Sequence, residues 1–224
     1  MLGPLLAWLV GMGGKLWVPF TQITSFVFLA VVYRTARWRG AQAIDAALIT
    51  FAIALTGAVQ TYKAGMVGYV DNLGYTITLC IWMSARRAWL FWPLVLLNLT
   101  NHEMVGFFLP WFLWLRRQAG GRLRTDIVAL VIVLGLYIAF RTYVGAHAKA
   151  WAYDANYFQR HSFLPFTFVY LWFLAAIHQL QMYGPLLAVL AWHLLRMRPD
   201  FERTHTLLIV GGFLTIFFFA YDVS

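Results

Sequence analysis

Long apolar runs separated by short polar clusters follow one another along the whole chain. The runs cover residues 16–33, 43–60, 70–83, 89–115, 126–144, 163–195 and 206–221. Many of them approach or exceed the roughly 20 apolar residues that a membrane-spanning helix needs. Several also contain Pro or Gly within the run, which membrane helices tolerate better than soluble ones. The pattern predicts an all-α fold, a polytopic transmembrane helical bundle that forms a single domain over residues 1–224.

Arginines gather in the polar clusters and indicate which ends of the runs share a side of the membrane. The four clusters lie at residues 34–39, 86–87, 116–124 and 196–203. Cytoplasmic loops of membrane proteins carry an excess of Lys and Arg. We therefore assign all four clusters to the cytoplasmic side, and the loops between them to the outer side.

This assignment decides how the run at 89–115 is folded. Arginines flank it on both sides, so a single crossing would place one cluster outside. We therefore expect a short helical hairpin around residues 89–115, with Asn101, His102 and Glu103 at its tip. Each arm of about twelve residues rises only about 18 Å, less than the roughly 30 Å of a bilayer core. Between the arginine clusters at 116–124 and 196–203 the chain must likewise cross the membrane an even number of times. This predicts an outer interfacial helix around residues 164–174, followed by one crossing at 175–195.

Composition excludes a soluble protein and a nucleic-acid partner. The chain is 62% hydrophobic and only 11% charged, whereas soluble domains are usually about 25% charged. The net charge of +9 sits in the short clusters, so we attribute it to orientation in the bilayer and to contact with membrane lipid. The single cysteine, Cys80, excludes an intramolecular disulfide and a multi-cysteine metal site.

The ends of the chain leave its completeness open. The apolar stretch at residues 2–10 is too short to span a membrane, and the sequence stops directly after its last apolar run. The domain is therefore expected to be either complete or truncated at one or both ends.

Glu103 is the strongest candidate for chemistry, because it is one of two glutamates and the one inside an apolar run. An ionisable group at membrane depth is costly and by default indicates a functional site. The topology places His102, Glu103 and Asp71 on the outer side, where a carboxylate would act as a general base and His102 would orient it. The candidate substrate-binding residues on that side are Lys63, Arg160 and Asp222.

Each candidate also has a purely structural interpretation. His102 and Glu103 would close the helix tip by bonding each other, and Asp71 would serve as the N-cap of the following helix. No HExxH pattern follows His102, because position 106 is Gly106, so neither a metal nor another cofactor is predicted. A divalent metal held by residues of several helices is kept as an alternative, although no motif supports it. Asn98-Leu99-Thr100 fits the glycosylation pattern, but it lies inside an apolar arm and is taken as chance.

Several short motifs give the chain a resemblance to a known family. They are Gly68-Tyr69-Val70-Asp71-Asn72-Leu73-Gly74-Tyr75, Leu97-Asn98-Leu99-Thr100-Asn101-His102-Glu103, Phe108-Leu109-Pro110 and Ala220-Tyr221-Asp222-Val223-Ser224. In this order, over residues 60–224, the chain resembles polytopic membrane glycosyltransferases of the GT-C type. The resemblance implies an enzyme of the bacterial inner membrane that transfers a sugar from a polyprenyl-phosphate carrier at the outer face.

The chain departs from that family where the catalytic base is usually found. The family carries a carboxylate in its first outer loop, but residues 1–44 contain no Asp or Glu. Either that part is missing, or Asp71 or Glu103 has taken the role, or there is no catalysis. The alternative function is a non-enzymatic membrane protein that binds or transports a lipid or small solute.

Overall fold

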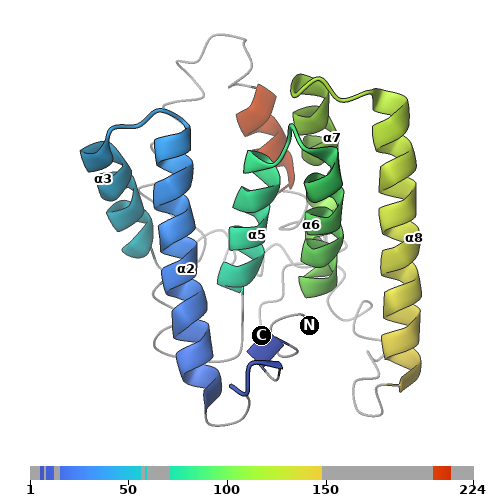
Figure 1. The fold of residues 1–224 in the computed structure, drawn as a ribbon, viewed down its shortest axis with the longest axis horizontal. Helices are drawn as coiled ribbons and strands as arrows, with labels where there is room; N and C mark the ends of the chain where they lie inside the picture. The colour runs from blue at the N-terminus through green and yellow to red at the C-terminus, as the bar shows by residue number, and fades with distance from the viewer. Residues whose placement is uncertain are drawn as a thin grey trace, which may run out of the picture. The chain divides into compact units, whose positions relative to one another are not determined.

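The structure is a computed structural model that describes residues 6–7, 9–12, 16–56, 59, 71–147 and 204–212. All regular elements in these residues are helices. They are α2 (Trp17–Trp38), α3 (Ala43–Ala54), α5 (Asp71–Met83), α6 (Ala88–Asn101), the 3₁₀ helix η2 (Glu103–Phe108), α7 (Leu109–Gln118), α8 (Leu123–His147) and a short helix at 204–212 (Figure 1). The all-α class predicted from the sequence is confirmed for these residues.

The chain divides into two compact units. Unit 1 comprises Met1–Glu103 and Leu115–Leu134, and unit 2 comprises Met104–Trp114 and Gly135–Ser224. Within unit 1, α2 packs against both α3 and α5, and α5 packs against α6 (Figure 1). Phe28 and Val32 of α2 are buried in the core of unit 1, where Tyr75 of α5 packs against them. Apolar contact therefore orders these helices as α3, α2, α5 and α6.

Two helices end in the same glycine motif. Gly40 follows α2 and Gly120 follows α7, with φ values of +94° and +87°. In both turns the backbone N–H groups after the helix donate back to its last carbonyls, as in Ala41 N to Ala36 O and Gly121 N to Arg116 O. Glycine adopts positive φ without a Cβ clash, which makes it the common residue after a helix end. The sequence around each glycine is therefore sufficient to explain why the helix ends and the chain turns there.

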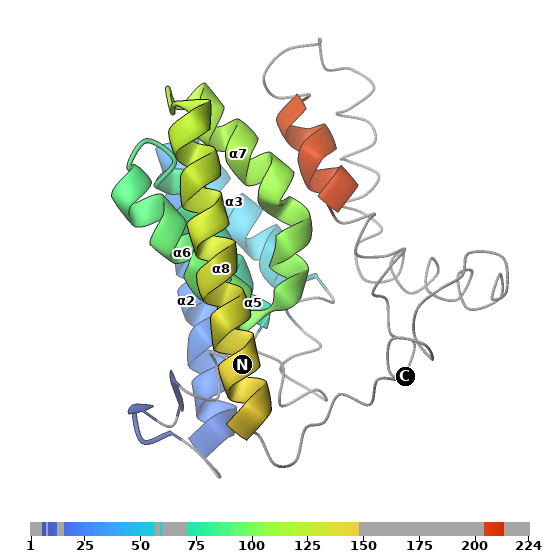
Figure 2. The same ribbon diagram turned by 90° about the vertical axis from the view of Figure 1, so that its right-hand side faces the viewer.

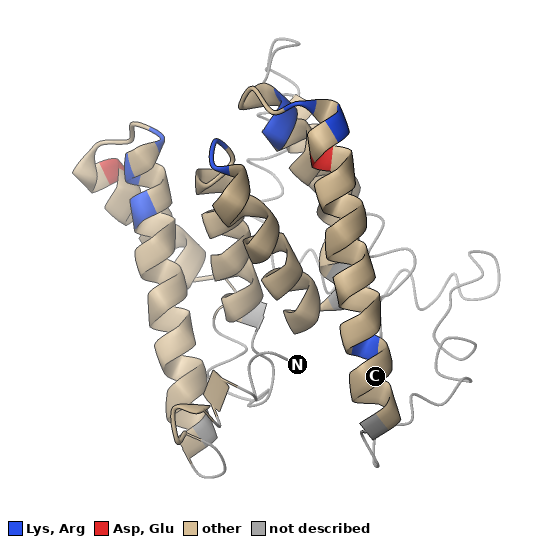
Figure 3. Cartoon of the chain, turned by 45° about the vertical axis from the view of Figure 1, so that its right-hand side comes forward, with Lys and Arg blue, Asp and Glu red and all other residues tan. Residues whose placement is uncertain are grey.

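The arginines of unit 1 gather at one end of its helices (Figure 3). This arginine end comprises the end of α2 and the residue after it, the turn between α5 and α6, and the end of α7 with the turn and first residues of α8; its arginines are Arg34, Arg37, Arg39, Arg86, Arg87, Arg116, Arg117, Arg122 and Arg124. Packing ties the first two turns together, because Trp38 and Trp82 stack edge to face with ring centroids 5.9 Å apart. The structure thus brings three of the four predicted clusters to a shared end; the fourth, at 196–203, lies outside the described residues.

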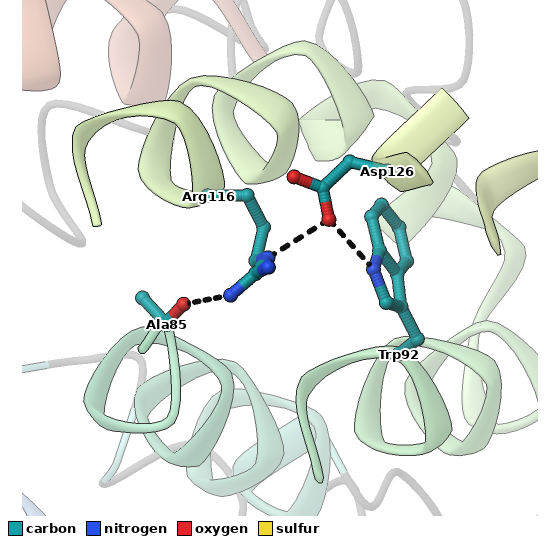
Figure 4. Close-up of polar contacts among 4 residues, drawn as sticks. All are labelled: Ala85, Trp92, Arg116 and Asp126. Carbon is teal, nitrogen blue, oxygen red and sulfur yellow. Dashed lines mark hydrogen bonds and ion pairs between the residues drawn. The ribbon is translucent and has the colours of Figure 1, made fainter. Parts of the chain in front are cut away.

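A buried ion pair joins the turns at this end (Figure 4). Arg116 Nε donates to Asp126 Oδ1 at 3.0 Å, and the two side chains are only 8% and 3% exposed. Trp92 Nε1 donates to the same carboxylate oxygen at 3.2 Å. Because Asp126 lies in the first turn of α8 and Arg116 in the last turn of α7, each charge also suits its helix dipole. The cluster links α6, α7 and α8 through their ends.

The segment predicted as a hairpin is broken where the sequence indicates. α6 ends at Asn101, His102 has extended backbone angles (φ −151°, ψ 123°), and Glu103 begins η2. Arg116 Nη1 near the end of the segment donates to Ala85 O just before its start, at 2.5 Å. The two ends of the segment therefore meet, as expected for a chain that goes out and returns.

Other elements differ from the predicted bounds by a few residues. α5 and α8 closely match the runs at 70–83 and 126–144, whereas α2 continues past Tyr33 to include Arg34 and Arg37. α3 ends at Ala54, where Thr56 Oγ1 donates to Ile53 O. Such a hydroxyl competes with the backbone for helix carbonyls near a helix end. The predicted interfacial helix at 164–174 and the crossing at 175–195 lie outside the described residues.

Among the described helices, one is both long and apolar enough to cross a membrane. It covers Leu123–Ala146 within α8, where an 18-residue stretch has a mean hydropathy of 2.2 and is only 6% buried. A shorter apolar helix is Ala43–Ala54. Its side chains Ile44, Leu48 and Phe51 are between 61% and 73% exposed. Both helices thus present apolar surface outward.

Unit 2 contains an aromatic cluster around a histidine. Trp111 Nε1 of α7 donates to His205 Nδ1 at 3.2 Å, and His205 is 9% exposed. The rings of Trp111 and Trp114 lie 5.5 and 5.6 Å from the imidazole. The helix at 204–212 therefore packs beside α7 (Figure 2), with Gly212 so close to Phe108 that a Cβ there would lie 2.6 Å from its ring.

Candidate functional site

Two of the predicted catalytic positions lie at the same end of the α5–α6 pair. Asp71 is the first residue of α5, and His102 directly follows the last residue of α6. The two helices are packed neighbours of nearly equal length, and a tight turn joins the end of α5 to the start of α6 at the arginine end. They therefore run antiparallel, and Asp71 and His102 lie at the end away from the arginines.

Glu103 follows directly and begins η2, so its backbone shares this end. His102 is half-buried. The side chains of Asp71 and Glu103, and all of Lys63, Arg160 and Asp222, lie outside what the structure describes. The structure thus brings the backbones of three of the six predicted residues to one end of unit 1.

A chain of hydrogen bonds runs from α5 to α6 just below this end. Thr78 Oγ1 donates to Gly74 O at 2.9 Å, and Asn98 Nδ2 donates to Thr78 Oγ1 at 2.8 Å. The threonine proton is used within its own helix, so the hydroxyl is an acceptor for Asn98 and the orientation of the amide is fixed. Asn98 is 0% exposed, and its Oδ1 has no hydrogen-bond partner among the described residues.

A second series of hydrogen bonds, with the same order of donors and acceptors, runs between α2 and α5. Ser25 Oγ donates to Thr21 O at 3.0 Å, and Asn72 Nδ2 donates to Ser25 Oγ at 2.7 Å. The serine proton is again used on its own helix, which fixes the Asn72 amide. Asn72 is 3% exposed, and its Oδ1 likewise has no partner among the described residues. Each series of hydrogen bonds therefore ends in a buried amide oxygen that accepts no hydrogen bond from the described residues.

Gly74 leaves room for the amides of α6. A Cβ at this position would lie 3.2 Å from Asn101 Nδ2 and 3.5 Å from Asn98 Oδ1. The lack of a side chain at Gly74 thus allows both carboxamides to approach α5 closely. Asn101 is itself 8% exposed, so the last turn of α6 presents two buried amides directly before His102.

Buried acceptors of this kind favour a ligand that carries hydrogen-bond donors. Leaving one such atom unpaired costs about 1–3 kcal/mol, and such atoms are rare in native structures. Hydroxyl or ammonium groups of a ligand would pair with Asn72 Oδ1 and Asn98 Oδ1. No group of three or more His, Cys, Asp or Glu that could hold a metal ion occurs in the described part of the chain.

Sequence reasoning missed the asparagines. From the sequence, Asn98 was given no binding role of its own and was rejected as a glycosylation acceptor, and its complete burial agrees with that rejection. The available signal was that three asparagines, Asn72, Asn98 and Asn101, interrupt apolar helical runs. Polar residues within such runs face the bundle interior and mark functional paths.

Replacement of Asn98 by leucine should leave the stability nearly unchanged. Leucine has a similar volume and removes the unpaired Oδ1, while Thr78 keeps its bond to Gly74 O. We expect the free energy of unfolding in detergent to change by less than about 1 kcal/mol. Thr78→Val is the control and should cost about 1–3 kcal/mol, because it leaves both ends of the Asn98 amide unpaired. A larger loss in the free energy of unfolding for Asn98→Leu than for Thr78→Val would contradict this prediction. It would mean that Asn98 stabilises the fold.

No family model matches the chain, and no curated protein or solved structure was found to be similar to it.

Proposed function

We propose that the chain is a multi-pass protein of a bacterial inner membrane that transfers a sugar from a polyprenyl-phosphate carrier to an acceptor. The observation that carries this proposal is the pair of buried acceptors, Asn72 Oδ1 and Asn98 Oδ1, at the helix ends where Asp71 and Glu103 begin their elements. Sugar hydroxyls are the donors that such acceptors would bind. The resemblance to GT-C glycosyltransferases supplies the reaction type.

The proposed topology follows from the segregation of charge in unit 1. Nine arginines share one end (Figure 3), and such an end faces the cytoplasm in membrane proteins. The amide chains and the positions of Asp71, His102 and Glu103 lie toward the other end, which would open to the outer leaflet. Exposed apolar surface on α3 and α8 is suited to contact with lipid tails.

In the proposed reaction Glu103 acts as the general base. It takes the proton from the acceptor hydroxyl, whose oxygen attacks the anomeric carbon while the bond from that carbon to the carrier phosphate breaks. The carrier leaves as a phosphate anion, and Lys63 or Arg160 would stabilise the charge. His102 orients Glu103, and Asp71 and Asp222 bind sugar hydroxyls.

The test is sugar transfer by the full chain in liposomes supplied with polyprenyl-phosphate-linked hexoses and pentoses. We expect Glu103→Gln to lower the transfer rate at least tenfold, because an amide does not accept the proton. Asp45→Asn is the matched control, since this exposed acid lies at the arginine end, and it should leave the rate unchanged.

Two outcomes separate the proposal from the alternative, a protein that binds or transports a lipid or small solute without chemistry. Full transfer by the Glu103→Gln variant would exclude Glu103 as the base. Binding of the carrier-linked sugar by the unmodified chain without any transfer would support the alternative, which the uncharged nature of the buried amides also favours.

A further inference from the structure

A groove runs between α2 and α3 on the surface of unit 1. It is a shallow, largely open groove with a volume of about 480 Å³. It is lined by Leu29, Ala30, Tyr33, Ala47, Thr50, Phe51 and Ala54. Phe51 is 62% exposed and Tyr33 37%, so the groove is open to the surroundings of the protein.

The groove is almost entirely apolar. Thr50 is one of its two hydroxyl-bearing residues, and its Oγ1 donates to Ala46 O at 2.7 Å within α3. The other is Tyr33, which lies at the end of the groove nearest the arginines. From Ala47 to Ala54 the groove follows α3 for roughly 10 Å at the rise of an α-helix. Its occupant should therefore be an elongated apolar group.

Two arginines continue the face of α2 that lines the groove. Arg34 comes four residues after Ala30, and Arg37 comes four residues after Tyr33. Residues four apart lie above one another on the same face of a helix. Both arginines are exposed, and each lies about 6 Å further along the axis than the lining residue below it. The apolar groove thus leads to a pair of guanidinium groups.

Arg34 and Arg37 are the charged residues at the end of the groove, because the other charged residues nearby are directed away from it. Arg37 Nη1 donates to Ala41 O at 2.8 Å, which holds its guanidinium near the start of α3. Arg39 is directed elsewhere, with its Cζ 5.5 Å from the ring centroid of Trp82 on α5. Asp45 opposes the positive charge, but it lies two residues before Ala47 and therefore on a different face of α3.

We propose that this groove binds an anionic phospholipid, with one acyl chain between α2 and α3 and the phosphate between Arg34 and Arg37. The apolar part of the site fits the chain, and its positive mouth complements the phosphate. Arginine suits this role because its planar guanidinium binds phosphate through two parallel hydrogen bonds. The lipid belongs to the leaflet at the arginine end. This inference is independent of sugar transfer, which we place at the opposite end.

The test measures lipid retention by the purified full chain in detergent, with native mass spectrometry. Dioleoyl phosphatidylglycerol is compared with dioleoyl phosphatidylcholine, which has the same acyl chains, and with glycerol 3-phosphate, which has none. We expect phosphatidylglycerol to bind roughly tenfold more tightly than phosphatidylcholine, given the attraction of two arginines. Glycerol 3-phosphate should not be retained, because it lacks the apolar part.

Arg34→Gln with Arg37→Gln should remove this preference to within about twofold. The matched control is Arg86→Gln with Arg87→Gln, an exposed pair of equal charge between α5 and α6, which should preserve it. Equal retention of the two lipids by the unmodified chain would overturn the proposal. An equal loss in both double variants would also overturn it, because the attraction would then be one of general charge.

A second pair of variants tests the groove itself. Ala47→Trp fills it from an exposed position, whereas Ala52→Trp adds the same side chain to another exposed face of α3. We expect Ala47→Trp to lower phosphatidylglycerol retention at least fivefold and Ala52→Trp to leave it unchanged. Circular dichroism verifies that both remain folded. Unchanged retention in the Ala47→Trp variant would show that the lipid binds elsewhere.

Discussion

Replacement of Asp126 by alanine is expected to lower the free energy of unfolding by about 3–5 kcal/mol. The change leaves the guanidinium of Arg116, whose side chain is 8% exposed, buried without its counter-ion. Breaking a buried pair from one side typically costs this much. It also removes the acceptor of Trp92 Nε1. Denaturant unfolding in detergent, followed by tryptophan fluorescence, measures the loss.

Two further variants show whether the loss comes from the unpaired charge. Asp45→Ala removes an exposed acid from the first turn of α3 and should cost no more than about 1 kcal/mol. The double variant Arg116→Met with Asp126→Leu replaces both charges by apolar groups, and it should be more stable than Asp126→Ala alone. If the double variant were the less stable one, the hydrogen bond from Arg116 to Ala85 O would be the main contribution.

Replacement of Gly121 by alanine should destabilise the same cluster by about 1–3 kcal/mol. A Cβ at this position would lie 2.3 Å from Asp126 Oδ2 and 2.7 Å from Arg116 O. The second of these atoms is backbone, so relief requires the turn between α7 and α8 to shift. Thermal unfolding of the purified protein measures the effect.

Gly120→Ala is the neighbouring comparison. Its position has open space around a Cβ but a φ of +87°, so alanine there should cost only about 1 kcal/mol of backbone strain. The prediction requires Gly121→Ala to be the more harmful of the two. The opposite order would mean that the turn adapts easily to a side chain near Asp126.

The helices and their shared end were predictable from the sequence. Apolar runs gave α5 and α8 within a few residues, because length and hydropathy are local properties. The arginine clusters on both sides of the segment 89–115 predicted that it folds back on itself near His102. The contact between Arg116 and Ala85 agrees with this return of the chain. The side of a membrane on which this arginine end lies stays a prediction, which rests on the excess of Lys and Arg in cytoplasmic loops.

The pairing of individual side chains was not predictable in the same way. Arg116 was counted as one of several loop arginines, whereas it is buried against Asp126. The amide chains from Asn98 to Thr78 and from Asn72 to Ser25 depend on the register of neighbouring helices. Sequence alone does not give that register, because an apolar run is compatible with many rotations about its axis.

The positive charge at the arginine end of unit 1 comes from one type of side chain. All of its basic residues are arginines, and the three lysines of the chain, Lys15, Lys63 and Lys149, come elsewhere in the sequence. Lys15 comes two residues before α2, and Lys149 comes two residues after α8. Acylation modifies amines and leaves guanidinium groups charged. The positive charge of the arginine end is therefore not removed by lysine acetylation.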